Sequence, residues 1–289
     1  MEPVERFVTT RHLRLAVRDW NGVESDRPPL VLVHGLASNA RIWDLVAPYL
    51  QPRFRVVAID QRGHGQSDKP DEGYDYDTVS NDLVAAVAAL GFRRPVIVGH
   101  SWGAGVALHL AAVASKLPAA IVLVDGGTRE FGSAMTLDEA LVRLAPPRLA
   151  GTPRTEFIAR LRQRWPLETW SPELEAAIMG NFAVDDQDHI APYLTFERHL
   201  MVVQALWDAR PSRLYNLIRC PVLIVPADPP LPIDAAAASL LERNREAVDF
   251  AARTLSDARV VWARDSLHDI PLHHPQFLAE QIAAFVETI

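Results

Sequence analysis

Short runs of β-branched and other apolar residues alternate along the chain with amphipathic segments of helical spacing. Seven runs have the length and composition of β-strands. They span residues 14–20, 30–35, 55–60, 95–100, 120–125, 221–228 and 258–263. This alternation predicts an α/β fold with a mostly parallel sheet covered by helices.

The predicted helices surround these strands, and the strand ends carry the polar residues of interest. Helices are expected near residues 39–50, 77–90, 102–115 and 235–255, and from Pro275 onwards. In such a sheet the ligand crevice lies at the carboxyl ends of the strands. We therefore expect the functional residues to be among the Gly, His and Asp residues that end the strand runs.

The pattern changes between residues 127 and 218. Four helical segments follow one another there, and we expect no strand among them. They span residues 136–144, 154–165, 171–182 and 195–209. An insertion of roughly 90 residues is much longer than an ordinary connection. We therefore predict a core domain of residues 1–126 and 219–289, with a helical domain of residues 127–218 inserted into it.

The composition and net charge of the chain limit the classes of binding partner and the cellular location to be expected. The chain has 289 residues, 49% of them hydrophobic, with a formal net charge of −7 and a pI near 5.8. An acidic balance argues against nucleic acid or a membrane as a partner, since both attract clustered positive charge. A single cysteine, Cys220, excludes a disulfide within the chain, and the first residues carry no apolar signal segment. We expect a cytoplasmic protein, either a monomer or a homodimer.

The stretch Gly99-His100-Ser101-Trp102-Gly103 joins a predicted strand to a predicted helix. In that context G-x-S-x-G forces the serine into a strained turn that exposes its hydroxyl, and bulkier flanking residues would collide. Ser101 is therefore the candidate nucleophile.

A serine that attacks a carbonyl needs donors for the oxygen that becomes negatively charged. His34-Gly35-Leu36 follows an earlier strand. The backbone N–H groups of Leu36 and Trp102 are the expected oxyanion hole, in which one donor is typically worth about 3 kcal/mol of the barrier.

These motifs, with the stretches "VVAIDQRGHGQSDKP" and "LHDIPLHHPQFLAEQIAAF", resemble the α/β-hydrolase fold superfamily. The resemblance covers residues 30–125 and 221–289. It implies an eight-stranded, mostly parallel sheet, with the helical insertion as a cap after the sixth strand. It also implies a histidine base before the last helix, which His268 matches. His34, His64 and His100 belong to tight turns and are interpreted as structural. No spacing suggests a metal site, and no cofactor is expected.

Two aspartates are candidates for the acid that orients His268. Asp228 follows the strand that most α/β-hydrolases use, but Pro226 stands where their usual turn has glycine. Asp125 ends a cleaner strand and is followed by Gly126 and Gly127. Its position resembles the arrangement in some haloalkane dehalogenases and in zearalenone-type lactonases. Asp125 is slightly preferred.

The predicted reaction follows from the presence of a serine, Ser101, at the elbow between strand and helix. Related dehalogenases and epoxide hydrolases have aspartate at the elbow, whereas a histidine-activated serine suits acyl transfer. The sequence therefore predicts hydrolysis of a carboxylic ester or lactone through an acyl-enzyme. Alternatives within the fold are a carbon–carbon bond hydrolase, a cofactor-free perhydrolase and a ligand receptor.

The insertion is rich in aromatic residues, which favours a small hydrophobic substrate in a roofed pocket. Gly35, Trp102 and Trp207 are the expected substrate contacts. The aromatic residues of the insertion are Trp165, Trp170, Phe182, Tyr193, Phe196 and Trp207.

Overall fold

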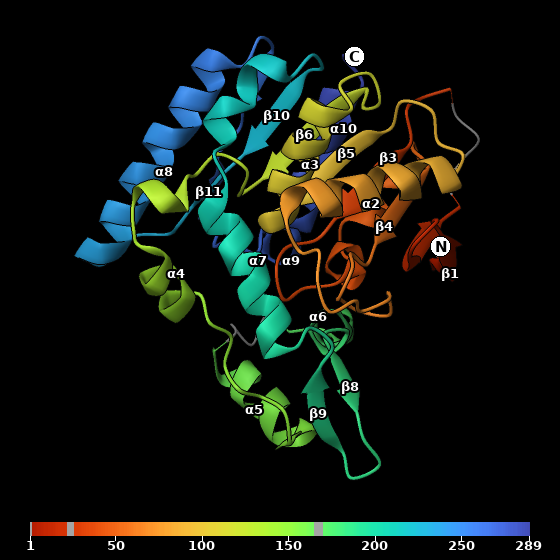
Figure 1. The fold of residues 1–289 in the computed structure, drawn as a ribbon, viewed down its shortest axis with the longest axis vertical. Coiled ribbons are helices and arrows are strands. Elements are labelled where there is room, and N and C mark those ends of the chain that lie inside the picture. The colour runs from red at the N-terminus through yellow and green to blue at the C-terminus, as the bar shows by residue number, and fades with distance from the viewer. Residues whose placement is uncertain (1, 22–25, 165–169) are drawn as a thin grey trace.

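The computed structural model describes residues 2–21, 26–164 and 170–289, and its centre is a sheet of eight strands (Figure 1). The strands lie in the order β1-β2-β4-β3-β5-β6-β10-β12. Their bounds are Val4–Thr9 (β1), Arg14–Trp20 (β2), Leu30–Val33 (β3), Val56–Ile59 (β4), Val96–His100 (β5), Ala120–Val124 (β6), Val222–Val225 (β10) and Ala258–Val260 (β12). The pairs β1–β2 and β2–β4 are antiparallel, and all the other pairs are parallel. The predicted α/β fold with a mostly parallel sheet of eight strands is confirmed.

The edge of this sheet holds a strand that the sequence pattern did not indicate. β1 pairs with β2 along its length, from Val4 opposite Asp19 to Thr9 opposite Arg14. Of its six residues only Val8 is buried. A strand whose side chains mostly face solvent carries no hydrophobic period, and so the pattern misses it.

Two predicted strands are each interrupted in the structure. The run 221–228 divides at Pro226 into β10 and the short β11 (Ala227–Asp228), and the run 258–263 divides into β12 and β13 (Ala263–Arg264). β11 and β13 form a separate two-stranded ladder. Proline has no N–H to donate to a neighbouring strand, which explains the break. The segment that carries Asp228 therefore leaves the main sheet.

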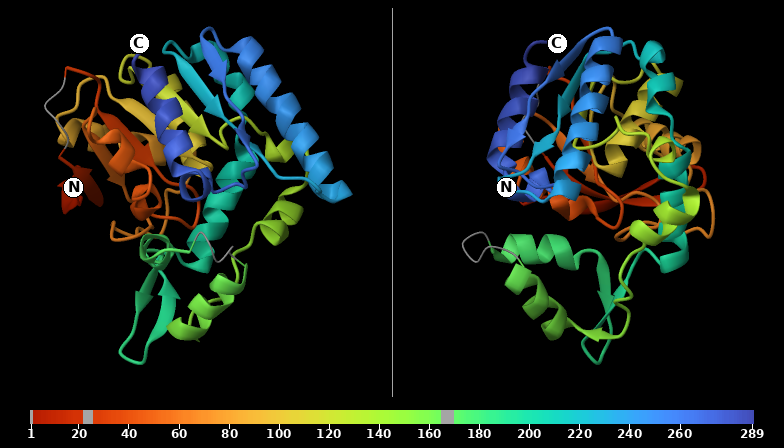
Figure 2. Two further views of the ribbon diagram at one scale, coloured as in Figure 1. Left: turned by 180° about the vertical axis from the view of Figure 1, so that it is seen from behind. Right: turned by 90° about the vertical axis from the view of Figure 1, so that its left-hand side faces the viewer.

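Helices cover both faces of the main sheet (Figures 1 and 2). Their bounds are Ala47–Leu50 (α1), Tyr76–Ala89 (α2), Trp102–Val113 (α3), Ala235–Thr254 (α8), Ile270–His273 (α9) and Pro275–Val286 (α10). Ala107 of α3 and Val248 of α8 share one buried cluster with Val31 of β3. Ile282 of α10 shares a second cluster with Leu30 of the same strand. Successive strand residues thus fill the two cores in turn. Among the described helices, none is long and apolar enough to cross a membrane.

The segment between β6 and β10, called the insertion below (residues 127–218), extends beyond the carboxyl end of the parallel strands (Figure 2). In the part of it that the structure describes there are four α-helices: α4 (Leu137–Arg143), α5 (Arg154–Arg164), α6 (Pro172–Met179) and α7 (Phe196–Asp208). All four lie within the predicted helical segments. The sixth strand in chain order, β6, directly precedes them.

The expectation of a strand-free insertion is wrong. Three short strands, β7 (Thr152–Pro153), β8 (Phe182–Val184) and β9 (His189–Pro192), form an antiparallel sheet in the order β7-β9-β8. The carboxylate of Asp185 accepts the backbone N–H groups of Gln187 and His189, which closes the hairpin between β8 and β9. Strands of two to four residues are too short to show an alternation in the sequence.

Candidate active site

The candidate nucleophile lies in the tight turn between β5 and α3. Ser101 has φ 54° and ψ −117°, a conformation that costs a residue other than glycine about 1–3 kcal/mol. A Cβ atom on Gly99 would lie 2.1 Å from the carbonyl oxygen of Gly103, and one on Gly103 would lie 2.5 Å from the carbonyl oxygen of His34. Both glycines are therefore required by the close approach of the backbone segments that hold Ser101 in place.

Ser101, His268 and Asp125 form a continuous hydrogen-bonded chain. His268 lies in the loop between β13 and α9, with its Nε2 atom 2.9 Å from Ser101 Oγ. Its Nδ1 atom lies 2.6 Å from Asp125 Oδ2, directly after β6. The other carboxylate oxygen of Asp125 accepts the N–H of Ala227 at 3.0 Å. Three loops at the carboxyl ends of the strands thus bring the three side chains together.

The charges of this chain favour a carboxylate beside a basic imidazole. Burial raises the pKa of Asp125, but the hydrogen bond and charge of His268 outweigh it, so that the pKa lies below its usual value. Desolvation alone would lower the pKa of His268. The hydrogen bond and charge of Asp125, and then the charge of Asp269, outweigh this effect, so that the pKa lies above its ordinary value. A carboxylate on Nδ1 also leaves Nε2 facing Ser101, as a general base requires.

Asp228, the rival acid, does not contact His268. Its two carboxylate oxygens instead accept hydrogen bonds from Arg245 at 3.1 Å and Arg264 at 2.8 Å. The break at Pro226 explains this placement, because it directs Asp228 into the β11–β13 ladder. Of the two aspartates that the sequence offers, the structure pairs Asp125 with the histidine.

His100, interpreted from the sequence as structural, lies directly against His268. Its Nε2 atom is 3.0 Å from the carbonyl oxygen of His268, and the two ring centroids are 4.9 Å apart. Burial lowers the pKa of His100 to about 4, and so its ring is neutral at neutral pH. In that state Nε2–H donates to the carbonyl and steadies the backbone of His268.

Both expected oxyanion donors lie beside the serine. Trp102 is the first residue of α3, and an N–H at that position has no acceptor within its helix. A Cβ atom on Gly35 would lie only 2.9 Å from the Cβ of Ser101, so the loop that carries Leu36 passes directly by Ser101. A side chain at position 35 would clash with Ser101, which explains why this residue is glycine.

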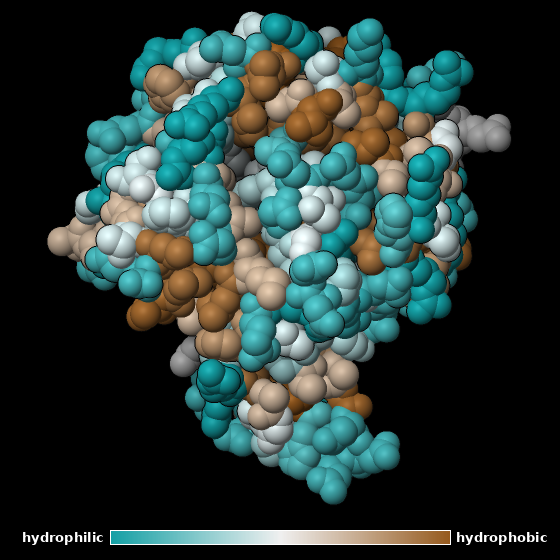
Figure 3. Space-filling model, in the orientation of Figure 1, coloured by the Kyte–Doolittle hydropathy of each residue, from teal (hydrophilic) through white to brown (hydrophobic). Residues whose placement is uncertain are grey.

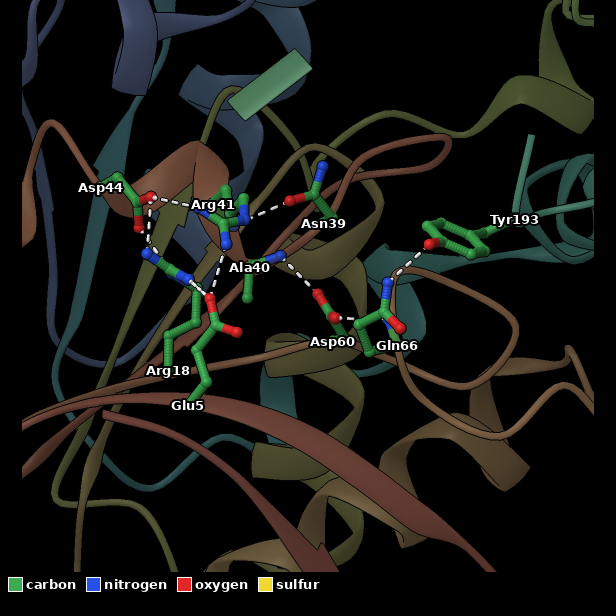
Figure 4. Close-up of polar contacts among 9 residues, drawn as sticks. All are labelled: Glu5, Arg18, Asn39, Ala40, Arg41, Asp44, Asp60, Gln66 and Tyr193. Carbon is green, nitrogen blue, oxygen red and sulfur yellow. Dashed lines mark hydrogen bonds and ion pairs between the residues drawn. The ribbon is translucent and has the colours of Figure 1, made fainter. Parts of the chain in front are cut away.

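The loop after β3 is held by a buried carboxylate (Figure 4). Asp60 accepts the N–H of Ala40 at 2.6 Å and the N–H of Gln66 at 2.8 Å. The side-chain amide of Gln66 in turn donates to the hydroxyl of Tyr193 at 2.7 Å. The same network therefore ties the loop next to Ser101 to the insertion.

Two cavities meet at Ser101. The larger, of about 1190 Å³, is lined by parts of α3, α4, α7 and α8. The smaller, of about 380 Å³, is lined by parts of α5, α6 and α9. Leu36, Ser101 and His268 line both cavities, whereas Gly35 lines the smaller and Trp102 the larger. A substrate bound at Ser101 can therefore extend in two directions.

Both cavities mix apolar and polar side chains. In the smaller one, the apolar side chains of Leu161 and Ile178 lie with the polar side chains of Asn181 and Asp269. The larger one is more charged than expected, because arginines from several elements reach it. They are Arg129, Arg143, Arg210, Arg213 and Arg243. Apolar side chains gather over α4 at its rim, where Val142 is 78% exposed (Figure 3).

Of the two tryptophans expected to contact the substrate, Trp102 lines the larger cavity and Trp207 does not. Trp207 lines neither cavity at Ser101, because its indole Nε1 donates to the carbonyl oxygen of Met135 at 2.8 Å. The indole of Trp102 is fully buried, with its ring 5.5 Å from that of His64. Trp165 lies outside the described residues. Trp102 and Trp207 therefore contribute to packing.

In the described ranges no group of three or more His, Cys, Asp or Glu is arranged to hold a metal ion.

A family model described as the alpha/beta hydrolase fold matches residues 28–255. This match covers most of the chain and agrees with the strand order and the serine elbow. The protein belongs to the α/β hydrolase fold family.

Curated relatives share parts of the sequence. An uncharacterized protein of Mycobacterium tuberculosis is 36% identical over 125 residues, which is 43% of this chain and 36% of that protein. The 2-(acetamidomethylene)succinate hydrolase of Mesorhizobium japonicum is 32% identical over 122 residues, 42% of each chain. These matches span well under half of the relatives' length. A putative carbamate hydrolase, RutD of Klebsiella pneumoniae, is 27% identical over 80% of this chain and 82% of its own.

Solved structures share the fold over the whole chain. The crystal structure of E-2-(acetamidomethylene)succinate hydrolase superposes with a TM-score of 0.77 at 23% identity, covering 99% of both chains. A thioesterase domain from the curacin biosynthetic pathway gives a TM-score of 0.76 at 20% identity, covering 98% of this chain and all of that one. At these identities the likeness concerns the fold alone.

Proposed function

We propose that the protein is a serine hydrolase that cleaves a carboxylic ester or lactone through an acyl-enzyme. The observation that carries this proposal is the chain of hydrogen bonds from Ser101 Oγ through His268 to Asp125, at 2.9 Å and 2.6 Å. The hydrolases among the relatives support the general class of reaction. They do not select the bond that is cleaved.

In the proposed mechanism His268 takes the proton of Ser101 as the hydroxyl attacks the substrate carbonyl. The N–H groups of Leu36 and Trp102 stabilise the oxyanion of the tetrahedral intermediate. His268 then protonates the leaving alcohol and afterwards activates a water molecule that releases the acid. Asp125 holds the imidazole in the required tautomer and stabilises its charged form in both steps.

The two cavities fit a substrate with a group on each side of the scissile carbonyl. The insertion contributes residues to both, including Leu161 to the smaller and Arg143 to the larger. We therefore propose that it serves as the cap of the active site. The apolar side chains of the smaller cavity, among them Leu161 and Ile178, would contact the hydrophobic part of a small substrate.

The proposal is tested by steady-state hydrolysis of a panel of esters and lactones of increasing acyl or ring size, with the Ser101→Ala protein as the blank. We expect turnover that depends on Ser101 and is confined to a narrow range of sizes. Turnover of a β-diketone or peracid formation, with no ester or lactone hydrolysis, would instead identify a carbon–carbon hydrolase or a perhydrolase. Binding without any turnover would favour a ligand receptor.

A further inference from the structure

Arg129 is one of several charged residues in the larger cavity that the proposed mechanism does not use. It follows β6 by a few residues and lines that cavity together with Ser101, Asp125 and His268. Burial and the bond between Asp125 and His268 dominate the pKa values of those two groups, and the charge of Arg129 is a smaller influence that lowers both. The guanidinium is therefore an electrostatic neighbour of the catalytic chain.

The guanidinium of Arg129 is partly buried without a carboxylate of its own. Among the described residues Arg129 forms no ion pair, and its contact is with the ring of Phe131, 5.0 Å from the guanidinium carbon. The Asp125 carboxylate acts on it from a distance but is bonded to His268 and Ala227. Arg243, from α8, adds a second positive charge nearby. A desolvated cation without a counter-charge is costly unless a ligand supplies that charge.

The other acidic side chains that line this cavity are already engaged. Each accepts a hydrogen bond from a neighbouring residue, and among the described residues none forms an ion pair with an arginine of the cavity. The hydrogen-bonded pairs are Asp75 with Thr78, Asp77 with His109, Glu130 with Ser212, Asp208 with Gln204 and Asp234 with Ala237. The charge of Arg210 acts on Glu130 from a distance, but none of these acids is among the groups that shift the pKa of Arg129. The cavity therefore offers cationic hydrogen-bond donors to a ligand near Ser101.

We infer that Arg129 binds a carboxylate of the substrate, on the side of the scissile carbonyl that enters the larger cavity. The planar guanidinium matches a carboxylate with two parallel hydrogen bonds. The substrate class is then an ester or lactone that carries a free carboxylate on one side and a hydrophobic group on the other. This inference rests on the proposed hydrolysis at Ser101.

A matched pair of substrates tests the inference. 4-Nitrophenyl hydrogen glutarate carries the carboxylate, and 4-nitrophenyl methyl glutarate has the same chain with the charge removed. We expect the wild-type protein to prefer the acid. In Arg129→Gln the ratio of the two kcat/KM values, acid over methyl ester, should fall by about 10- to 100-fold, as loss of a charged hydrogen bond predicts.

Arg53→Gln is the matched control. Arg53 is an exposed arginine that pairs with Glu287 at 3.0 Å and lines neither cavity at Ser101. This variant should keep the wild-type ratio. A ratio that is equally unchanged in Arg129→Gln, or a wild-type protein without preference for the acid, would overturn the inference.

Binding to a protein without turnover separates this inference from the proposed function. In the Ser101→Ala background, calorimetry with glutarate should show a Kd that rises about 10-fold or more when Arg129→Gln is added. Binding that depends on Arg129, with neither ester hydrolysed by the wild type, would keep the carboxylate site and reject the hydrolase. Ester hydrolysis by the wild type, without glutarate binding that depends on Arg129, would keep the hydrolase and reject the carboxylate site.

Discussion

Replacing Ser101 by alanine should lower kcat for an ester substrate about 10⁶-fold, and replacing His268 by alanine should have a similar effect. The two side chains act as one unit, because the base at 2.9 Å has no function without the hydroxyl that it deprotonates. The double variant should therefore be no slower than either single variant. The measurement is kcat under saturating substrate for the three variants and the wild type.

Ser115→Ala, just beyond the other end of α3, is the control for this comparison, and it should retain the wild-type rate. Circular dichroism should show all variants folded, since alanine fits the space that Ser101 occupies. Additive losses in the double variant, or a rate in Ser101→Ala within tenfold of the wild type, would contradict the shared role.

Asp125→Asn should lower kcat about 10⁴-fold, whereas Asp228→Asn should leave it within a few-fold of the wild type. Asparagine keeps the shape of the side chain but removes the charge that stabilises the imidazolium and selects its tautomer. Asp228 pairs with two arginines and does not contact His268. Its loss therefore leaves the hydrogen bonds among Ser101, His268 and Asp125 in place. The measurement is kcat for both variants on the same ester.

The pH dependence of the residual activity distinguishes an orienting acid from a general loss of structure. His268 must be neutral to act as a base, so the rate falls as the pH drops through its pKa. Asp125 raises that pKa, and Asp125→Asn should therefore move the acidic limb of the kcat/KM profile to lower pH. An unshifted limb, or a greater loss in Asp228→Asn than in Asp125→Asn, would return Asp228 as the acid.

The main sheet and the serine elbow could be predicted from the sequence because short-range physics determines both. Buried parallel strands such as Leu30–Val33 are apolar throughout, and a Cβ atom on Gly99 would clash with Gly103 within the same turn. The sequence could reduce the candidates for the acid to Asp125 and Asp228 but could not decide between them. The decision depends on the path of the chain after Pro226, which is a property of the tertiary structure.

The features that the sequence pattern missed have two different causes. Trp207 is directed away from Ser101 by a bond to Met135, 72 positions earlier, which is a contact between distant segments. The hairpin of the insertion is local, closed by the Asp185 carboxylate, but its strands are too short to show an alternation. Arg129 carries no motif, although its place shortly after the strand that ends at Asp125 was a usable signal. Its significance emerges only when the cavity shows which charges lack a partner.

The most direct test of the central claim, that Ser101 is a nucleophile activated by His268, is covalent labelling with a fluorophosphonate followed by intact-mass and peptide analysis. We predict one phosphonyl adduct per chain, on the peptide that contains Ser101, and much slower labelling in His268→Ala. A wild-type protein that remains unlabelled, or that is labelled equally in Ser101→Ala, would contradict the claim.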